Sequence, residues 1–224
     1  MNRIRLVICR HGESIMNQHN KFSGWTDTPL NRLGIAQSFT VANLLKNNDF
    51  IPNKIFTSRL SRSYQTSEII RYHLQKNIPM ELSWRLNERN YGVLEGVSRS
   101  DAEEEYGKEN IHLIRNDYYT LPYFSNGEPI KDLNILHNND RTNVLGESGN
   151  MVMKRFYPYW DIEVKKALLE DRSILIVSHK HILRCIIQLL EGKKYENIFI
   201  DNGEVIIYEF DNNLQLVQKK NWRA

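Results

Sequence analysis

The sequence predicts an α/β fold: three layers (α/β/α), with helices on both faces of a mostly parallel central sheet. Two features predict it. Short, nearly continuous apolar segments rich in branched residues indicate strands that are buried on both faces. Amphipathic stretches alternate with these segments, as in folds where helices cover a parallel sheet. The length of 224 residues and the hydrophobic content of 41% suit one domain, residues 1–224, with a substantial core.

The first half of the chain contains two predicted strand–helix pairs. In order, we expect a strand at 4–9, a helix at 31–46, a strand at 54–58 and a helix at 61–74. In the first helix apolar residues recur at helical spacing, namely Ile35, Phe39, Ala42 and Leu45. Asn31 and Ser61 stand at the two helix starts. Their side chains can accept hydrogen bonds from free backbone N–H groups, so each is a predicted N-cap.

The same alternation returns after residue 150. We expect a helix at 159–170, a strand at 173–178, a helix at 181–191 and a strand at 204–210. Residues 107–149 differ, because they are rich in Gly, Pro, Asn and Asp and show no sustained period. A loop of this length inside a compact domain is usually functional or mobile. We therefore predict a loop-rich insertion or lid over the sheet edge at about 107–149.

Composition argues against several classes of protein. The net charge of +3, with no Lys/Arg-rich run, does not indicate nucleic-acid binding. No apolar run approaches the roughly 18 residues of a membrane span, and the apolar segment at 4–9 is too short and interrupted for a signal peptide. Cys9 and Cys185, with no CxxC motif, indicate neither a disulfide framework nor structural zinc. We expect a cytoplasmic protein without nucleic-acid or membrane partners.

Three charged clusters follow predicted strands: RHGES at 10–14, SRLSR at 58–62 and SHKH at 178–181. In an open α/β sheet, ligands bind at the carboxyl ends of the strands. Gly12 allows a tight turn, and Glu13 with Ser14 opens a helix whose free N–H groups favour an anion. The SHKH cluster by itself is compatible with a metal pair, a proton relay, a phosphate cradle or a solvated turn.

Arg10 and His11 together suit phosphoryl chemistry. The guanidinium of Arg10 offers a fork of donors that matches phosphate. His11 can be a nucleophile for phosphorus if its ring is neutral and a hydrogen bond orients the other nitrogen. The alternative is an ordinary pair of solvated residues at a strand end, which the motif alone leaves open.

Four ordered segments carry a family resemblance: LVICRHGESIMNQHNKFSGWTDTPLNRLG, FTSRLSRSYQT, SWRLNERNYGVLEG and IVSHKHILR. Together they resemble the cofactor-dependent phosphoglycerate mutases of the histidine phosphatase superfamily, in order from about residue 3 to about residue 220. The resemblance implies a phosphoglycerate mutase-like fold and interconversion of 3-phosphoglycerate and 2-phosphoglycerate, a step of glycolysis and gluconeogenesis. It also implies 2,3-bisphosphoglycerate as primer, no metal, and a homo-oligomer (dimer or tetramer).

The resemblance implies roles for individual residues. His11 would become phosphohistidine, and Glu88 would be the general acid and base. The residues implied around the transferred phosphoryl group are Arg10, Arg62, His179 and, as a neutral donor, Asn17. Such a ring of donors suits phosphoryl transfer, which needs positioning and charge neutralisation. Repulsion from a phosphate dianion would favour the protonated form of Glu88. The residues implied to grip the rest of the substrate are Ser23, Gly24, Arg89, Tyr91, Arg99 and Arg115.

The sequence departs from the family at several positions. Asn116 replaces the second of two consecutive arginines, and Arg99 stands where Lys is common. Lys180 and His181 replace Gly and Asn, and the chain stops at Ala224, without the longer tail of many members. We expect Lys180 to offset the cation missing at Asn116, and His181 to donate to substrate in place of Asn. The alternatives to a mutase are a histidine phosphatase acting on a small phosphorylated metabolite and a non-catalytic phospholigand-binding relative.

Overall fold

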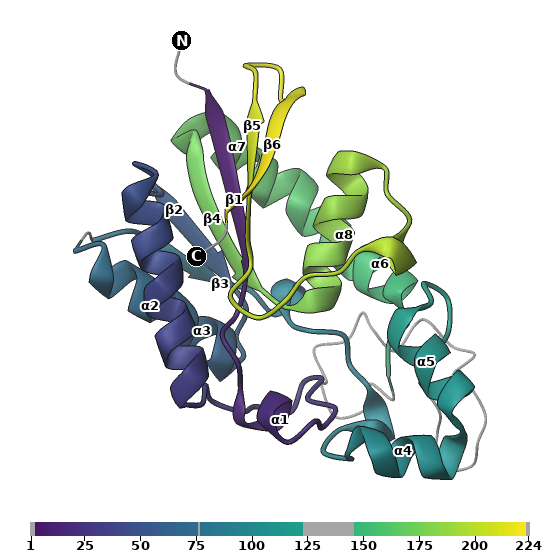
Figure 1. Cartoon of the computed structure of the whole chain (residues 1–224). Helices are drawn as coiled ribbons and strands as arrows, with labels where there is room; N and C mark the ends of the chain where they lie inside the picture. Colours follow the sequence, from purple (N-terminus) through teal and green to yellow (C-terminus); the bar gives the residue numbers. More distant parts are fainter. Residues whose placement is uncertain (1–2, 76, 123–145, 223–224) are drawn as a thin grey trace.

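A six-stranded mixed sheet forms the centre of the protein (Figure 1). The computed structural model describes residues 3–75, 77–122 and 146–222. The sheet order is β3-β2-β4-β1-β5-β6. The first four strands of this order run parallel, and β5 and β6 join antiparallel at one edge. The strands are β1 Ile4–Arg10, β2 Lys54–Thr57, β3 Met80–Leu82, β4 Ser173–Ser178, β5 Val205–Phe210 and β6 Leu216–Trp222.

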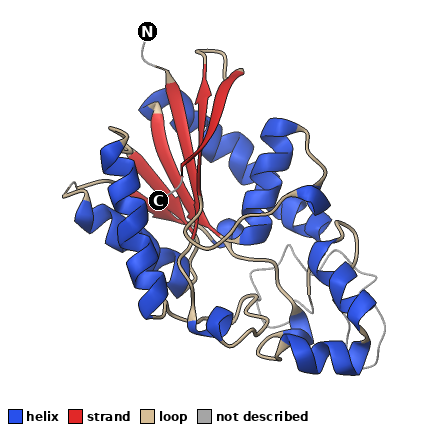
Figure 2. Ribbon diagram, viewed as in Figure 1, coloured by secondary structure: helices blue, strands red, loops and turns tan. Residues whose placement is uncertain are grey.

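Helices cover both faces of the sheet, which confirms the predicted α/β fold (Figure 2). One face packs against α2 (Arg32–Asn47) and α3 (Ser61–His73). The other packs against α6 (Gly149–Tyr159), α7 (Lys165–Asp171) and α8 (Lys180–Glu191). Side chains of a strand alternate between faces, so β1 contributes to both halves of the core. Its branched apolar residues are therefore fully buried.

Two helix starts differ from each other in how they are capped. The predicted N-cap Asn31 is confirmed, since its side chain accepts the backbone N–H of Gly34 at 2.8 Å. The prediction for Ser61 is wrong. Leu60 is the N-cap of α3 and makes no side-chain cap, while Ser61 donates its N–H and hydroxyl to the carboxylate of Asp27. A carboxylate from a distant loop thus supplies this cap.

The buried face of α2 is rotated from the predicted one. Ala42 and Leu45 are buried as expected, but Ile35 and Phe39 are 42% and 40% exposed. Small residues take the inner face at the start of the helix instead, Gly34 and Ser38 among them. They allow α2 to approach the turn that follows β1.

A separate small unit lies beside the carboxyl ends of the strands (Figure 1). It contains α4 (Arg99–Tyr106) and α5 (Lys108–Asn116), whose apolar residues form a third cluster with Phe22 and Tyr91. Irregular structure was expected from residue 107, and this is wrong for α5, because Ile111 and Ile114 supply a buried helical face. The rest of the predicted insertion lies largely outside the described residues.

The helical stretch before β4 is longer than predicted, and the elements not yet described are short. The predicted helix at 159–170 begins earlier, as α6, and continues through a π-helical segment, Trp160–Val164, into α7. The others are α1 Ile15–Gln18 and the 3₁₀ turns η1 Trp84–Leu86, η2 Gly92–Leu94 and η6 Tyr195–Asn197. Across the described parts of the chain, no helix has the length and apolar character that crossing a membrane requires.

Candidate active site

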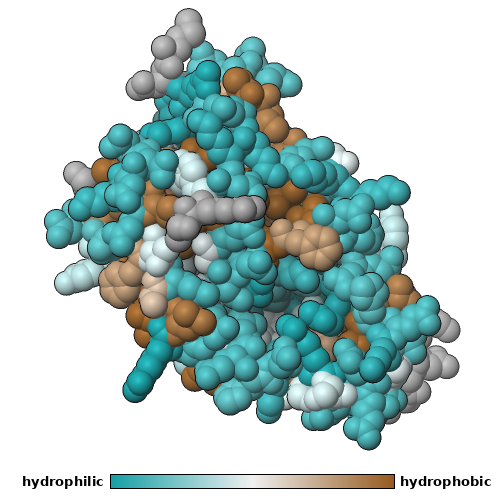
Figure 3. Space-filling view, in the orientation of Figure 1, coloured by the Kyte–Doolittle hydropathy of each residue, from teal (hydrophilic) through white to brown (hydrophobic). Residues whose placement is uncertain are grey.

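A polar hollow lies where β1, β2 and β4 end, and the three charged clusters of the sequence meet there. The hollow is partly open to solvent. The surface of this side of the molecule is largely hydrophilic (Figure 3). The predicted site residues that line the hollow are Arg10, His11, Asn17, Ser23, Gly24, Arg62, Glu88, Tyr91, Arg99, Arg115, Lys180 and His181.

His11 is a neutral, oriented imidazole. Its Nδ1 lies 2.7 Å from the carbonyl oxygen of Gly12. A carbonyl only accepts, so Nδ1 carries the proton and Nε2 keeps its lone pair. Burial lowers the pKa of His11 well below its usual value, and Arg62 and Arg10 lower it further. A neutral ring with a free Nε2 can act as a nucleophile.

The turn after β1 is held by close packing. Gly12 does not adopt a positive φ, so the expected role of backbone freedom is not what this position requires. A Cβ on Gly12 would lie 2.2 Å from the oxygen of Gly34, and one on Gly34 would lie 2.0 Å from the oxygen of Glu13. Two glycines therefore let α2 pack directly against the turn that carries His11.

Ser14 opens α1 as the sequence predicts. Its hydroxyl accepts the N–H of Asn17, and the side-chain oxygen of Asn17 accepts the N–H of Ser14 in return. With its oxygen used as an acceptor, Asn17 offers its amide N–H groups to the hollow that it lines.

His179 packs directly on His11, with ring centroids 4.8 Å apart. It is fully buried and does not itself line the hollow. Its Nε2 is 2.7 Å from the hydroxyl oxygen of Ser58, and its Nδ1 finds no hydrogen-bond partner among the described residues. Burial lowers the pKa of His179 well below its usual value, with Arg62 the next cause. This nitrogen therefore keeps its hydrogen-bonding capacity for a ligand atom or a water molecule.

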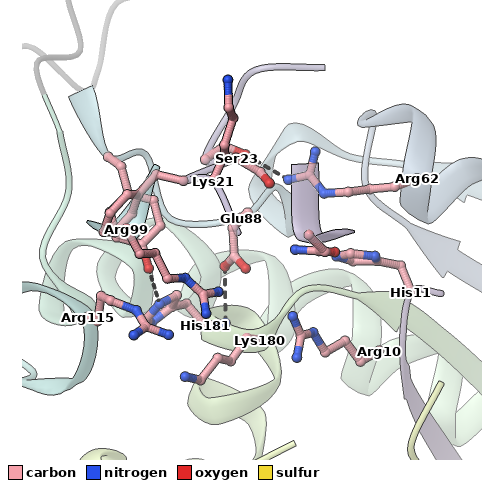
Figure 4. A pocket seen from close by; sticks show the side chains of 14 residues that line it. Arg10, His11, Lys21, Ser23, Arg62, Glu88, Arg99, Arg115, Lys180 and His181 are labelled. Atoms are coloured by element: carbon pink, nitrogen blue, oxygen red, sulfur yellow. Dashed lines mark hydrogen bonds between the residues drawn. The ribbon is translucent and has the colours of Figure 1, made fainter. Parts of the chain in front are cut away.

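Positive charge dominates the hollow. Among its described lining residues, Glu88 is the one carboxylate, against six cationic side chains: Arg10, Lys21, Arg62, Arg99, Arg115 and Lys180. Lys21 and Phe22 also line the hollow. They lie within the first of the four family-like segments, but the sequence analysis gave them no role. Figure 4 shows Arg10, His11 and Arg62 at one side, Arg99, Arg115 and His181 at the other, and Glu88 between them.

Two arginines on the His11 side are fixed by backbone carbonyls. Arg62 donates to the carbonyl oxygens of Gly24 at 2.7 Å and Thr26 at 3.2 Å. Burial lowers its pKa to about 10. Arg10 donates to the carbonyl of Ile200 at 2.9 Å, while its buried Nε is unpaired within the described chain. Both guanidiniums are thus positioned before any ligand arrives.

Glu88 is held by two backbone amides. Its Oε1 accepts the N–H of Arg89 at 2.9 Å and that of His181 at 3.1 Å. The indole of Trp25 donates to the carbonyl of Glu88 at 2.5 Å. With Oε1 used in this way, Oε2 is the oxygen available for proton exchange in the hollow.

A buried ion pair supports the segment that carries Glu88, and the sequence analysis missed it. Arg155 and Glu147 are 2.6 Å apart, with side chains 3% and 0% exposed. Arg155 also donates to the carbonyls of Asn87 at 2.7 Å and Glu88 at 2.9 Å. No local signal marks Arg155, because the carbonyls that it holds lie 68 and 67 positions away in the sequence.

Arg89 and Asn116 are not brought to the hollow. Arg89 donates to the carbonyls of Glu147 and Thr120. The side-chain oxygen of Asn116 accepts from Arg184 at 3.3 Å. The neighbouring cation of Asn116 is therefore Arg184, and a second arginine at position 116 would face a like charge.

Lys180 is the first residue of α8 and has ordinary helical geometry, so lysine causes no backbone strain there. Burial lowers its pKa to about 7, and Arg184 and Arg115 are the next causes.

Both ring nitrogens of His181 are hydrogen-bonded to tyrosine hydroxyls, those of Tyr91 and Tyr195. The described residues contain no group of three or more His, Cys, Asp or Glu side chains that could hold a metal ion.

A neutral histidine and converging cations at the strand ends of a three-layer α/β fold form the kind of site that phosphoryl transfer requires. Comparison with protein families matches residues 6–223 to the histidine phosphatase superfamily (branch 1), and the chain belongs to that superfamily. A protein of Staphylococcus carnosus (strain TM300), named 2,3-bisphosphoglycerate-dependent phosphoglycerate mutase, is 35% identical over 226 residues. This match covers 96% of this chain and 97% of the relative.

Solved structures share the fold. A putative alpha-ribazole-5'-P phosphatase from Escherichia coli (str. K-12 substr. MG1655) superposes with a TM-score of 0.73 at 22% identity, over 99% of this chain and 95% of that one. A phosphoglycerate mutase from Bacillus anthracis (str. Sterne) superposes with a TM-score of 0.72 at 21% identity, over 100% and 93%. At these identities the structures establish the fold alone.

Proposed function

We propose that the protein interconverts 3-phosphoglycerate and 2-phosphoglycerate through a phosphohistidine at His11, primed by 2,3-bisphosphoglycerate. One observation carries the proposal: the neutral His11 keeps its Nε2 lone pair in a hollow whose described lining residues include six cationic side chains and one carboxylate, that of Glu88. The relative named as a mutase, 35% identical over nearly the whole chain, supports the substrate.

The donor set fits a bisphosphorylated acid. Buried polar atoms without partners among the described residues include Arg10 Nε, Ser23 Oγ and His179 Nδ1. They lie on or directly behind the wall of a hollow with a large excess of positive charge. When bound, 2,3-bisphosphoglycerate supplies the phosphoryl group that phosphorylates His11. No metal is needed for this chemistry, since the cations of the chain neutralise the phosphate charge.

The residues of the chain divide into two groups. On one side, His11 Nε2 forms the N–P bond while Arg10, Arg62, His179 and Asn17 hold the phosphoryl oxygens. When the phosphoryl group moves to His11, Glu88 Oε2 gives a proton to the oxygen that leaves phosphorus. When the phosphoryl group moves back, Glu88 takes a proton from the substrate hydroxyl group that attacks the phosphorus of phosphohistidine. On the other side, the remaining charge and the carbon skeleton of the substrate contact Arg99, Arg115, Tyr91, Lys180, Ser23 and Gly24.

A phosphatase is the second candidate. Asn116 contacts Arg184 and does not line the hollow, so the second cation of the family's arginine pair is absent there. A weaker grip on the bisphosphorylated acid would favour its loss and transfer of the phosphoryl group to water.

One assay separates the candidates. The protein is supplied with 3-phosphoglycerate and a trace of 2,3-bisphosphoglycerate, and both 2-phosphoglycerate and free phosphate are followed. The mutase predicts isomer formation with little phosphate, whereas a phosphatase releases phosphate alone. If neither product forms and no acid-labile label appears on His11, the enzyme proposal is wrong and a phospholigand-binding role takes its place.

A further inference from the structure

Lys180 is a lysine whose ammonium has no partner within the described part of the chain. It is half-buried and lines the hollow, and it makes no hydrogen bond or ion pair with the described residues. Figure 4 shows Lys180 between Arg10 and Arg115, with Glu88 above it. The carboxylate of Glu88 is held by two backbone amides. A half-buried amine without a counter-ion has little to stabilise its positive charge.

The groups around Lys180 also disfavour its charged form. α8 begins at Lys180, so the partial positive charge of a helix N-terminus lies beside the side chain. Burial lowers the pKa of Lys180 to about 7, whereas an ordinary lysine has a pKa of about 10.4 and is charged at neutral pH. The charged and titratable groups that surround it, from β1, the segment before η2, α4, α5 and α8, are Arg10, Glu88, Arg99, Arg115, His181 and Arg184.

The other side of the hollow offers donors to a phosphate group. Arg10 and Arg62 are fixed there by backbone carbonyls, beside His11. A phosphate held by them leaves the far end of a short ligand on the side where Lys180 and Arg115 lie (Figure 4). A neutral lysine amine attacks an electrophilic carbonyl carbon and forms a Schiff base. The hollow thus combines donors for phosphate with a nucleophilic amine.

We propose that Lys180 is a covalent binding site for small phosphorylated aldehydes, which form an imine with its Nζ. The nitrogen lone pair forms the C–N bond, and the carbonyl π electrons move to oxygen. Both protons of the amine end on that oxygen, which leaves as water, and Glu88 in the same hollow can pass them. The carboxylate of 3-phosphoglycerate is not electrophilic and does not react. The inference rests on the proposed function only for the phosphate-binding side of the hollow.

Glyceraldehyde 3-phosphate is the probe, because it has an aldehyde where 3-phosphoglycerate has a carboxylate. The full chain is incubated with it near neutral pH, borohydride reduces the imine to a stable amine, and peptide mass spectrometry finds the labelled lysine. We expect Lys180 to be labelled at least about tenfold faster than the exposed Lys154 of α6. Glyceraldehyde without phosphate should lose this preference.

Lys21 is the matched comparison within the same protein, since it lines the same hollow but is exposed. Equal labelling of Lys21 and Lys180, or the same preference for Lys180 with glyceraldehyde, would overturn the inference. Lys180→Arg keeps the positive charge and forms no stable label. It should lose the label at position 180 and leave the labelling of Lys154 unchanged.

The pH dependence of labelling is a second measurement on the wild type. The neutral fraction of Lys180 rises as the pH rises through about 7, so its labelling should level off above about pH 8. Labelling that keeps rising to about pH 9, as for an ordinary lysine, would overturn the inference. Selective labelling without isomer or phosphate in the activity assay would defeat the proposed function alone. Isomer formation without selective labelling would defeat this inference alone.

Discussion

The backbone amide of His181 donates to Oε1 of Glu88, with 3.1 Å between the two atoms. The side chain of His181 points instead to two tyrosines. The main chain of residue 181 therefore holds the carboxylate of Glu88, while the imidazole of His181 makes hydrogen bonds to the two tyrosine hydroxyls. A residue unusual for the family at position 181 is compatible with a correctly placed Glu88 for this reason.

His11→Ala should abolish turnover and keep the fold. The variant removes the proposed nucleophile, and we expect kcat to fall on the order of 10⁴-fold or more. His73→Ala is the control, because His73 lies on α3, outside the hollow, and contacts Asn43 at 2.7 Å. Steady-state kinetics and circular dichroism measure the two properties. Normal turnover in His11→Ala would show that another residue takes the phosphoryl group.

Lys180→Met should change the pH dependence of substrate binding. The pKa of Lys180 is lowered to about 7, so its positive charge is present below that pH and is lost as the pH rises through it. In the wild type, affinity for anionic 3-phosphoglycerate should therefore fall above pH 7. At pH 6 the variant should bind about tenfold more weakly, the scale of one charge-assisted contact.

The difference between the two pH profiles isolates Lys180, because the substrate titrates identically in both. Lys154→Met, at an exposed position of α6, is the control and should follow the wild type. If Lys180→Met keeps the wild-type KM across the range, Lys180 does not offset the cation missing at Asn116.

Arg155→Met should destabilise the protein strongly. It leaves the carboxylate of Glu147 buried without its cation, and it removes donors to the carbonyls of Asn87 and Glu88. We expect the free energy of unfolding to fall by about 3–5 kcal/mol, measured by urea denaturation. Replacing Glu147 with Leu in the same chain should restore only the part that comes from the unpaired charge, because the carbonyls of Asn87 and Glu88 stay without Arg155.

An exposed ion pair is the control for the buried one. Lys165 and Asp161 are 2.6 Å apart, with side chains 41% and 47% exposed. Lys165→Met should change the free energy of unfolding by less than about 1 kcal/mol. Similar losses for Lys165→Met and Arg155→Met would contradict the structural role given to the buried pair.

Gly34→Ala tests the close contact between α2 and the catalytic turn. In an open helix this change stabilises by up to about 1 kcal/mol. Here the new Cβ would lie 2.0 Å from the oxygen of Glu13, so we expect destabilisation by about 1–3 kcal/mol and a lower kcat. Gly192→Ala is the control: φ is +64°, and the added Cβ would have no atom of the described residues within 4 Å. This change should cost about 1 kcal/mol and leave kcat unchanged. A stabilised Gly34→Ala variant would refute the contact.

The fold was predictable where a segment of the sequence shows one clear pattern of apolar residues. β1, β2 and β4 lie where continuous apolar segments predict strands, and α8 begins one residue before its predicted start. β3 and β6 were not predicted. β3 has three residues, and β6 alternates weakly because it is an exposed edge strand. β3 is a strand because it pairs with β2, and β6 is a strand because it pairs with β5.

The chemistry of the site was likewise visible in local motifs. RHGES, SRLSR and SHKH follow three strands, and a parallel sheet must bring strand ends together. The contacts of individual side chains were not visible. Arg89 matches the family motif, yet it donates to backbone carbonyls outside the hollow.

By itself the sequence determined the order of elements, the sheet edge that carries the site and the residue types that meet there. Only the tertiary structure decided which atoms are free. It leaves Nδ1 of His179 without a partner within the described chain, and it uses both nitrogens of His181. It also adds an amide from the distant helix α8 to the neighbouring amide of Arg89 that holds Glu88. The physical reason is that local periodicity follows from neighbouring residues, whereas a buried hydrogen bond depends on groups that only the folded chain brings together.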